Sequence, residues 1–177
     1  MLTNQEIALL ALLAEKDYYG YELEKTIEHR AMREWTELSI SGIYKSLNKL
    51  ELKDLVSSSR EMTAENRLRK TYQITELGRE ALKTELEVLL RSYKQMKWPV
   101  DIGIYNLNII GNEDKAELLK EYRENLQDKI DEYSQVEKCL QEDGCKYYQV
   151  AVVSRQLSIF KGEMIWLNSF INQLAER

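Results

Sequence analysis

Histidine, cysteine and proline are scarce in this chain of 177 residues, which holds one histidine, two cysteines and one proline. The spacing of Cys139 and Cys145 fits no zinc motif, and His29 is the sole histidine, so we expect no protein-built metal site and no cofactor. No nucleophile lies at a useful spacing from a base, and no glycine-rich phosphate loop occurs. These absences argue against an enzyme.

Long apolar runs are absent as well. No stretch is long enough to span a bilayer, and residues 1–6 lack the basic start and apolar segment of a signal peptide. We therefore expect a cytoplasmic protein with no membrane partner, in which both thiols stay reduced.

Charge is unevenly distributed along the chain, whose net charge is −5. Residues 1–98 carry 16 basic and 16 acidic groups, whereas residues 99–177 carry 9 basic and 14 acidic groups. Within residues 39–70, seven basic groups face only four acidic ones. This local surplus is typical of a nucleic-acid-binding surface, while the acidic second half is better suited to a protein partner.

Three short helices are expected in the first fifty residues. Thr3 and Glu6 form a capping box, which predicts a helix from about Asn4, and a second helix is expected over residues 21–30. In the third helix, over residues 41–51, the apolar side chains recur at helical spacing and predict an inward face made of Ile40, Ile43, Leu47 and Leu50.

The opposite face of the third helix is polar. It carries Ser41, Tyr44, Lys45 and Asn48, with Lys49 at its edge and Ser39 just before the helix. Taken alone, such a face is equally consistent with ordinary solvated surface. These side chains can also donate to phosphate oxygens and base edges, which favours DNA binding.

A β-hairpin follows the third helix. Residues 55–62 and 68–75 alternate as strands do, and residues 63–67 form the predicted loop. Its basic side chains are Arg60, Arg67, Arg69 and Lys70. A basic hairpin directly after such a helix is typical of a wing that reaches the DNA backbone or minor groove. The order of three helices and a hairpin predicts a winged helix-turn-helix.

The rest of the chain is predicted to be helical. A long helix is expected from Thr75 to about Lys97, and Trp98-Pro99 ends it, which divides the chain into domains 1–98 and 99–177. Residues 100–110 fit a short helix or a strand. Two long helices, about 113–141 and 145–175, can then form an antiparallel hairpin.

The last helix has an unbroken apolar seam. It consists of Val150, Val153, Leu157, Phe160, Met164, Leu167, Ile171 and Leu174. Further apolar side chains lie off this seam, among them Ile165 and Trp166, and exceed what one hairpin covers. They either pack on the N-terminal domain or form a dimer interface. We favour a helical dimerisation domain that uses Val153, Leu157, Phe160, Met164, Leu167, Ile171 and Leu174, because DNA readers of this kind commonly bind two half-sites.

Several motifs of the first 80 residues together resemble the PadR-like family of transcriptional regulators, in its subgroup with a longer C-terminal helical domain. They are Gly20-Tyr21-Glu22-Leu23, Gly42-Ile43-Tyr44, Leu47-Asn48-Lys49-Leu50-Glu51, Leu55-Val56 and Arg69-Lys70-Thr71-Tyr72-Gln73-Ile74-Thr75-Glu76-Leu77-Gly78. The chain departs from the family pattern at Lys45, often proline, at Asp54, often glycine, and at Asn66-Arg67-Leu68, usually Gly-Arg-Pro.

The resemblance implies a mainly α protein, with a winged helix-turn-helix, a long linking helix and a C-terminal helical dimerisation domain. It implies a homodimeric repressor in which Tyr44 contacts DNA phosphate and Arg69 and Lys70 serve the wing. Family members often sense small aromatic molecules between the two domains. Trp35, Trp98, Tyr105 and Trp166 either line such a pocket or are ordinary core and interface residues.

We therefore expect a sequence-specific DNA-binding regulator that acts as a homodimer and is released by a small aromatic ligand. Its predicted DNA-binding residues are Ser39, Ser41, Tyr44, Lys45, Asn48, Lys49, Arg67, Arg69 and Lys70. The alternative is a protein-binding adaptor that uses its C-terminal helices and keeps a winged helix without binding DNA. The balanced charge of residues 1–98 is compatible with both.

Overall fold

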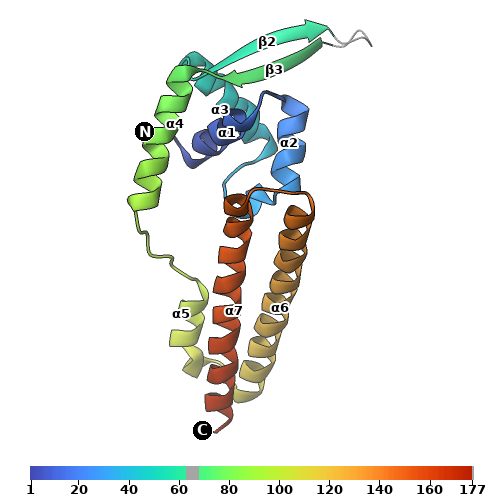
Figure 1. Ribbon diagram of the computed structural model, residues 1–177. Helices are drawn as coiled ribbons and strands as arrows, with labels where there is room; N and C mark the ends of the chain where they lie inside the picture. Colours follow the sequence, from blue (N-terminus) through green and yellow to red (C-terminus); the bar gives the residue numbers. More distant parts are fainter. Residues whose placement is uncertain (63–67, 177) are drawn as a thin grey trace. The chain divides into compact units, whose positions relative to one another are not determined.

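The chain divides into two units, residues 1–94 and residues 95–177, each with its own apolar core. Figure 1 shows the computed structural model, which describes residues 1–62 and 68–176. The N-terminal unit combines helices with a small sheet, and the C-terminal unit is helical. The mainly α fold with a winged helix-turn-helix is thereby confirmed.

Helix α1 (Asn4–Glu15) begins at the predicted capping box. The Glu6 backbone N–H donates to the Thr3 hydroxyl at 3.2 Å, and the Thr3 backbone N–H donates to the Glu6 carboxylate at 2.8 Å. These two bonds satisfy donors that the first turn of a helix otherwise leaves unpaired. Leu9 and Leu10 are fully buried, so α1 forms the centre of the unit's core.

Helices α2 (Gly20–His29) and α3 (Ile40–Leu52) pack near α1 (Figure 1), and a short 3₁₀ helix, η1 (Met32–Glu34), lies between them in the chain. The inward face of α3 is confirmed for Ile43, Leu47 and Leu50, which are 0% exposed. It is wrong for Ile40, which is 56% exposed. Ile40 is the first residue of α3, where the Cα–Cβ bond is tilted toward the helix N-terminus and so away from the turns that pack on the core.

The sheet has three antiparallel strands in the order β1-β3-β2, namely β1 (Tyr18–Tyr19), β2 (Val56–Met62) and β3 (Leu68–Ile74). The β2–β3 hairpin, called the wing below, was predicted, although its loop at residues 63–67 lies outside the described residues. Strand β1 could not be predicted, because a strand of two residues is too short to show alternation. Tyr18 of β1 pairs with Tyr72 of β3, and both side chains are buried.

Helix α4 (Glu76–Arg91) is shorter than predicted. Leu82 packs on the core, but Leu86, Leu89 and Tyr93, which continue its helical spacing, are exposed. Helices of this size owe most of their stability to the packing of an apolar face. Without that packing the helix stops at Arg91, and residues 92–98 have no regular secondary structure.

The C-terminal unit begins with α5 (Val100–Tyr105) and a 3₁₀ helix, η2 (Leu107–Ile109), so the helical alternative for this segment is correct. Helices α6 (Asn112–Glu142) and α7 (Tyr147–Ala175) then run side by side as the predicted antiparallel hairpin (Figure 1). Gly144 has a φ of 68° in the turn between them, a conformation that favours glycine. No helix of the described residues has the length and apolarity needed to cross a membrane.

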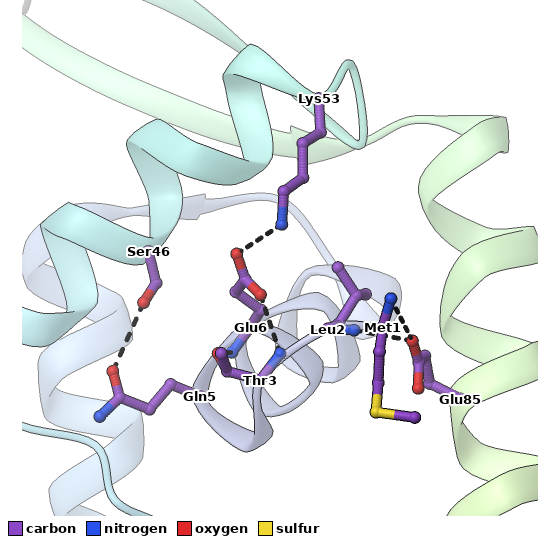
Figure 2. A network of polar contacts seen from close by, with 8 residues as sticks. All are labelled: Met1, Leu2, Thr3, Gln5, Glu6, Ser46, Lys53 and Glu85. Carbon is purple, nitrogen blue, oxygen red and sulfur yellow. Dashed lines mark hydrogen bonds and ion pairs between the residues drawn. The ribbon is translucent and has the colours of Figure 1, made fainter.

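A polar network beside α1 connects it and the residues before it to α4, to α3 and to Lys53 just after α3 (Figure 2). The Lys53 ammonium, just after α3, lies 2.8 Å from the buried carboxylate of Glu6. The backbone N–H of Leu2 donates to Glu85 of α4 at 2.7 Å, and Ser46 of α3 donates to Gln5 at 3.5 Å. The role of Glu6 in the capping box was predicted, but its pairing with Lys53 was not.

Candidate nucleic-acid interface

One face of α3 is polar and exposed, as predicted from the sequence. It carries Ser41, Tyr44, Lys45, Asn48 and Lys49, all of which are exposed. Ser39 precedes the helix, and its hydroxyl accepts a hydrogen bond from the Gly42 backbone N–H at 3.1 Å. Ser39 therefore caps α3 while its side chain stays at the surface.

The two lysines of this face, Lys45 and Lys49, are both exposed. Within residues 1–62 and 68–176, neither Lys45 nor Lys49 forms an ion pair or a side-chain hydrogen bond with the protein. Their ammonium groups are left to solvent, and to any anion that approaches the helix.

Tyr44 is more constrained than the lysines, although its side chain is 39% exposed. Partial burial, together with a hydrogen bond from its hydroxyl to Glu24 of α2, raises the pKa of Tyr44 above its ordinary value. Its ring lies against Gly20, where an added Cβ would come within 2.9 Å of the Tyr44 hydroxyl oxygen. Glycine at the start of α2 therefore makes room for a tyrosine of α3.

The wing carries the other predicted DNA-binding residues. Arg69 is exposed and its guanidinium lies 5.3 Å from the centre of the Tyr19 ring. Lys70 is partly buried, and its ammonium lies 2.9 Å from the Glu51 carboxylate of α3. Arg67 lies outside the described residues.

An open surface cavity of about 400 Å³ is lined by predicted DNA-binding residues of both α3 and the wing. Its lining residues are Tyr19, Gly20, Tyr21, Glu22, Tyr44, Arg69, Lys70 and Tyr72. The cavity thus joins the start of α2, the middle of α3 and strand β3 with aromatic walls and two cations. Neither Tyr19 nor Tyr21 was predicted to lie on this surface, because the two-residue strand β1, which pairs Tyr19 with Thr71 of β3, is too short to leave a pattern in the sequence.

The seven predicted dimerisation residues lie on α7, along its contact with α6 of the same chain. Val153, Leu157 and Leu167 are buried there, and the other four are partly buried. Elsewhere on α7, Ile165 and Trp166 are exposed, and Trp166 stacks on Phe170 with ring centres 5.1 Å apart. A role of the seven residues between two chains stays a prediction.

The four aromatic residues proposed for a ligand pocket are each exposed within their own unit. Trp35 belongs to the N-terminal unit, and Trp98, Tyr105 and Trp166 belong to the C-terminal unit. The part of the chain that the structure describes holds no group of three or more His, Cys, Asp or Glu side chains placed to bind a metal ion.

Comparison with known proteins adds a family to this geometry. Residues 9–84 match the model of the transcriptional regulator PadR-like family. An uncharacterised protein of Lysinibacillus sphaericus is 29% identical over 99 residues, which are 56% of this chain and 86% of that protein.

Solved structures share the fold of almost the whole chain. Bacillus subtilis PadR in complex with operator DNA has a TM-score of 0.81 at 18% identity, over 96% of this chain and 98% of that chain. The same protein in complex with p-coumaric acid has a TM-score of 0.80 at 18% identity, over 97% of this chain and 96% of that chain. The Vibrio cholerae virulence activator AphA has a TM-score of 0.74 at 19% identity, over 97% and 98%.

Proposed function

Since this chain is a member of the PadR-like family of transcriptional regulators, we propose that it is a homodimeric repressor that binds specific DNA sequences in the cytoplasm. The observation that carries the proposal is the α3 face, where two lysines without protein partners stand beside a capped helix start. Buried Ile43, Leu47 and Leu50 hold the opposite side of that helix, so the polar face can only point outward.

The polar face of α3 is proposed to enter the major groove. Ser39, Ser41, Tyr44, Lys45, Asn48 and Lys49 supply the contacts to phosphates and bases. The wing adds Arg67, Arg69 and Lys70 beside the groove. In a two-fold dimer, two such helices lie roughly 34 Å apart, one turn of the duplex, and read two half-sites.

Dimerisation is proposed for the C-terminal domain, residues 99–177. Its α7 helix carries Val153, Leu157, Phe160, Met164, Leu167, Ile171 and Leu174 along the hairpin, with further apolar side chains exposed beside them. An acidic domain with exposed apolar side chains is better suited to a second protein chain than to DNA.

We propose that a small aromatic ligand regulates this protein by releasing it from DNA. A relative of this fold has been solved with p-coumaric acid. Trp35, Trp98, Tyr105 and Trp166 are the aromatic residues that we propose for such a site. The ligand releases DNA only if it binds one geometry of the dimer more tightly than the other.

Binding to DNA from the chain's own upstream region tests the proposal, measured as fluorescence anisotropy over a range of salt concentrations. Lys45→Ala and Arg69→Ala should each weaken binding to every duplex and reduce the slope of log K against log salt by about 1. Lys83→Ala is a matched control, because Lys83 is an exposed lysine of α4. Salt slopes that match the wild type in both variants would remove these side chains from the interface.

Two further measurements cover the dimer and the direction of regulation. Analytical ultracentrifugation should give a dimer, and Trp166→Asp should weaken it. A purely monomeric wild type would contradict the two-site mode of binding. Deleting the gene should raise transcription from the bound promoter, whereas a fall would identify an activator, as the name of the Vibrio cholerae relative describes.

The alternative function is a protein-binding adaptor that uses the C-terminal helices and does not bind DNA. The equal numbers of basic and acidic groups in residues 1–98 are compatible with it. A gel shift with random-sequence duplex at low salt separates the two functions, because a DNA-binding regulator also binds non-specific duplex at low salt and retards it. No retardation would support the adaptor.

A further inference from the structure

A single carboxylate connects α3 to both strands of the wing. Glu51 lies in the last turn of α3 and accepts a hydrogen bond from the Ser58 hydroxyl of β2. It also accepts one from the Lys70 ammonium of β3, at 2.9 Å. Ser58 and Lys70 are neighbours on the paired strands, since Ser58 lies opposite Tyr72 and Lys70 lies opposite Arg60.

The surroundings favour a lasting contact over a chance surface pair. The Glu51 and Lys70 side chains are both only about one-third exposed, so water screens their attraction less than it screens an open pair. The Ser58 bond adds a second charge-assisted contact to the same carboxylate. Hydrogen bonds from Ser58 and Lys70 lower the pKa of Glu51, and the bond to Glu51 raises the pKa of Lys70.

Lys70 is also held from a second direction. Its ammonium lies 4.8 Å from the centre of the Tyr72 ring, which is itself buried. Lys45 and Lys49 of α3 have no such partners among the described residues. A phosphate would therefore have to displace Glu51 to reach the Lys70 ammonium, but would meet no such competitor at the two lysines of α3.

We propose that Glu51 is a positioning residue that fixes the angle of the wing against α3 through Ser58 and Lys70. In this proposal the Lys70 ammonium binds Glu51 instead of a DNA phosphate. The proposal rests on the proposed DNA-binding function for its consequence, and it narrows the role given to Lys70 there. In this arrangement Arg69, which is exposed and lies over the Tyr19 ring, remains a proposed phosphate contact of the wing.

Whether removal of the Glu51 carboxylate weakens or tightens DNA binding separates a positioning role from simple charge repulsion. A carboxylate near DNA repels phosphates, so its removal should tighten binding if it has no other role. If Glu51 sets the wing, its removal should weaken binding to the specific site, because the wing no longer matches the groove that α3 enters. Binding to random-sequence DNA does not require that match, so its affinity should fall much less.

The experiment compares the full-length wild type with Glu51→Ala, Glu51→Gln, Lys70→Ala and the Glu51→Ala/Lys70→Ala double variant. The probes are a duplex from the chain's upstream region and a random duplex of equal length. Each alanine variant should bind the upstream duplex about five- to tenfold more weakly, which corresponds to the loss of a charge-assisted bond. The double variant should be no weaker than either single one. Glu51→Gln keeps one acceptor oxygen but replaces the other with an NH2 donor, so it should fall between Glu51→Ala and the wild type.

Glu61→Ala is the matched control, because Glu61 is an exposed carboxylate of the same wing with no ion pair among the described residues. It should bind the upstream duplex as tightly as the wild type or more tightly. The salt slope of Lys70→Ala should equal that of the wild type. A slope reduced by about 1 would make Lys70 a phosphate contact and overturn the proposal. Tighter binding by Glu51→Ala would overturn it as well.

Hydrogen exchange without DNA keeps the test independent of the proposed function. Amides of β2 and β3 should exchange faster in Glu51→Ala and Lys70→Ala than in the wild type or Glu61→Ala, while α1 amides confirm that the variants are folded. Unchanged exchange in the wing would refute the positioning role. If the wild type binds neither duplex, the proposed function fails, and the exchange rates still decide whether Glu51 holds the wing.

Discussion

The Lys53 ammonium lies 2.8 Å from the Glu6 carboxylate, a group that the fold buries almost completely beside α1. Lys53 itself remains nearly half exposed, so the pair reaches from the core to the surface. Removing Lys53 leaves a buried carboxylate with only the hydrogen bonds that the Thr3 backbone N–H and hydroxyl donate to it. We predict that Lys53→Ala lowers the free energy of unfolding of the N-terminal unit by about 1–3 kcal/mol, measured by urea denaturation.

Lys49→Ala is the matched control for this prediction, because Lys49 is an exposed lysine one turn earlier on α3. Its effect on the free energy of unfolding should stay within about 0.5 kcal/mol. Equal losses in the two variants would mean that the Glu6–Lys53 pair contributes nothing beyond general charge effects.

The same pair predicts how the difference between wild type and variant changes with pH. Burial alone would raise the pKa of the Glu6 carboxyl, but hydrogen bonds from Lys53 and Thr3 outweigh it and hold the pKa below its ordinary value of 4.5. A lowered pKa stabilises the folded state above pH 4.5 and loses that contribution as the pH falls through the folded-state pKa. In Lys53→Ala, burial dominates and protonation of Glu6 relieves the unpaired charge.

The stability difference between wild type and Lys53→Ala should therefore be largest near neutral pH and should shrink as the pH falls towards and below 4.5. Denaturation of both proteins at a series of pH values measures it, and carboxylates common to both proteins cancel. A difference that stays constant from pH 7 to pH 3.5 would contradict the role of Glu6.

The local parts of the fold could be predicted from sequence because their signals are local. The Thr3–Glu6 capping box needs only four residues, and the spacing of Ile43, Leu47 and Leu50 needs only one helix. Ile40 fits the same spacing but is exposed, since a periodic pattern does not show where the helix begins.

The contacts between distant segments could not be predicted in this way. Glu51 with Lys70 and Glu6 with Lys53 are separated by 19 and 47 residues, and no periodicity relates their members. The end of α4 was also missed, because its apolar spacing continues beyond Arg91 although nothing in its unit covers Tyr93. The polar face of α3 was found because sequence order and a helical wheel are enough to define it.

Two glycines in helices should respond to alanine with opposite signs. Gly78 lies in the first turn of α4, where an added Cβ would clash with the Leu55 carbonyl oxygen. Because that oxygen belongs to the backbone, which also accepts the Thr75 N–H at 3.1 Å, it cannot move aside freely. Gly78→Ala should therefore lower the free energy of unfolding of the N-terminal unit by about 2–3 kcal/mol.

Gly162 lies in the interior of α7, and an added Cβ would meet no other atom within 4 Å. Gly162→Ala should raise the stability of the C-terminal unit by about 0.5–1 kcal/mol, because alanine loses less backbone entropy in a helix. Hydrogen exchange of α7 amides, read beside urea denaturation, measures this gain. A loss of stability would contradict this prediction.

Tyr122 should be the clearest titration probe of the C-terminal unit. Its hydroxyl donates to the Glu163 carboxylate at 3.0 Å, which connects α6 to α7. Burial and this neighbouring carboxylate raise the pKa of Tyr122 to about 12, from an ordinary value of 10.0. A raised pKa stabilises the fold below pH 10.0, and the contribution is lost as the pH rises through the folded-state pKa.

Tyr122→Phe should therefore cost about 0.5–1.5 kcal/mol between pH 7 and pH 9, and the difference from wild type should narrow above pH 10. Tyr105→Phe, at an exposed position of α5, is the control. It should change neither the free energy of unfolding nor the way that this free energy varies with pH. The difference in ultraviolet absorbance between wild type and Tyr122→Phe reports the ionisation of Tyr122 alone. A midpoint near 10 would show that Glu163 does not hold the hydroxyl in solution.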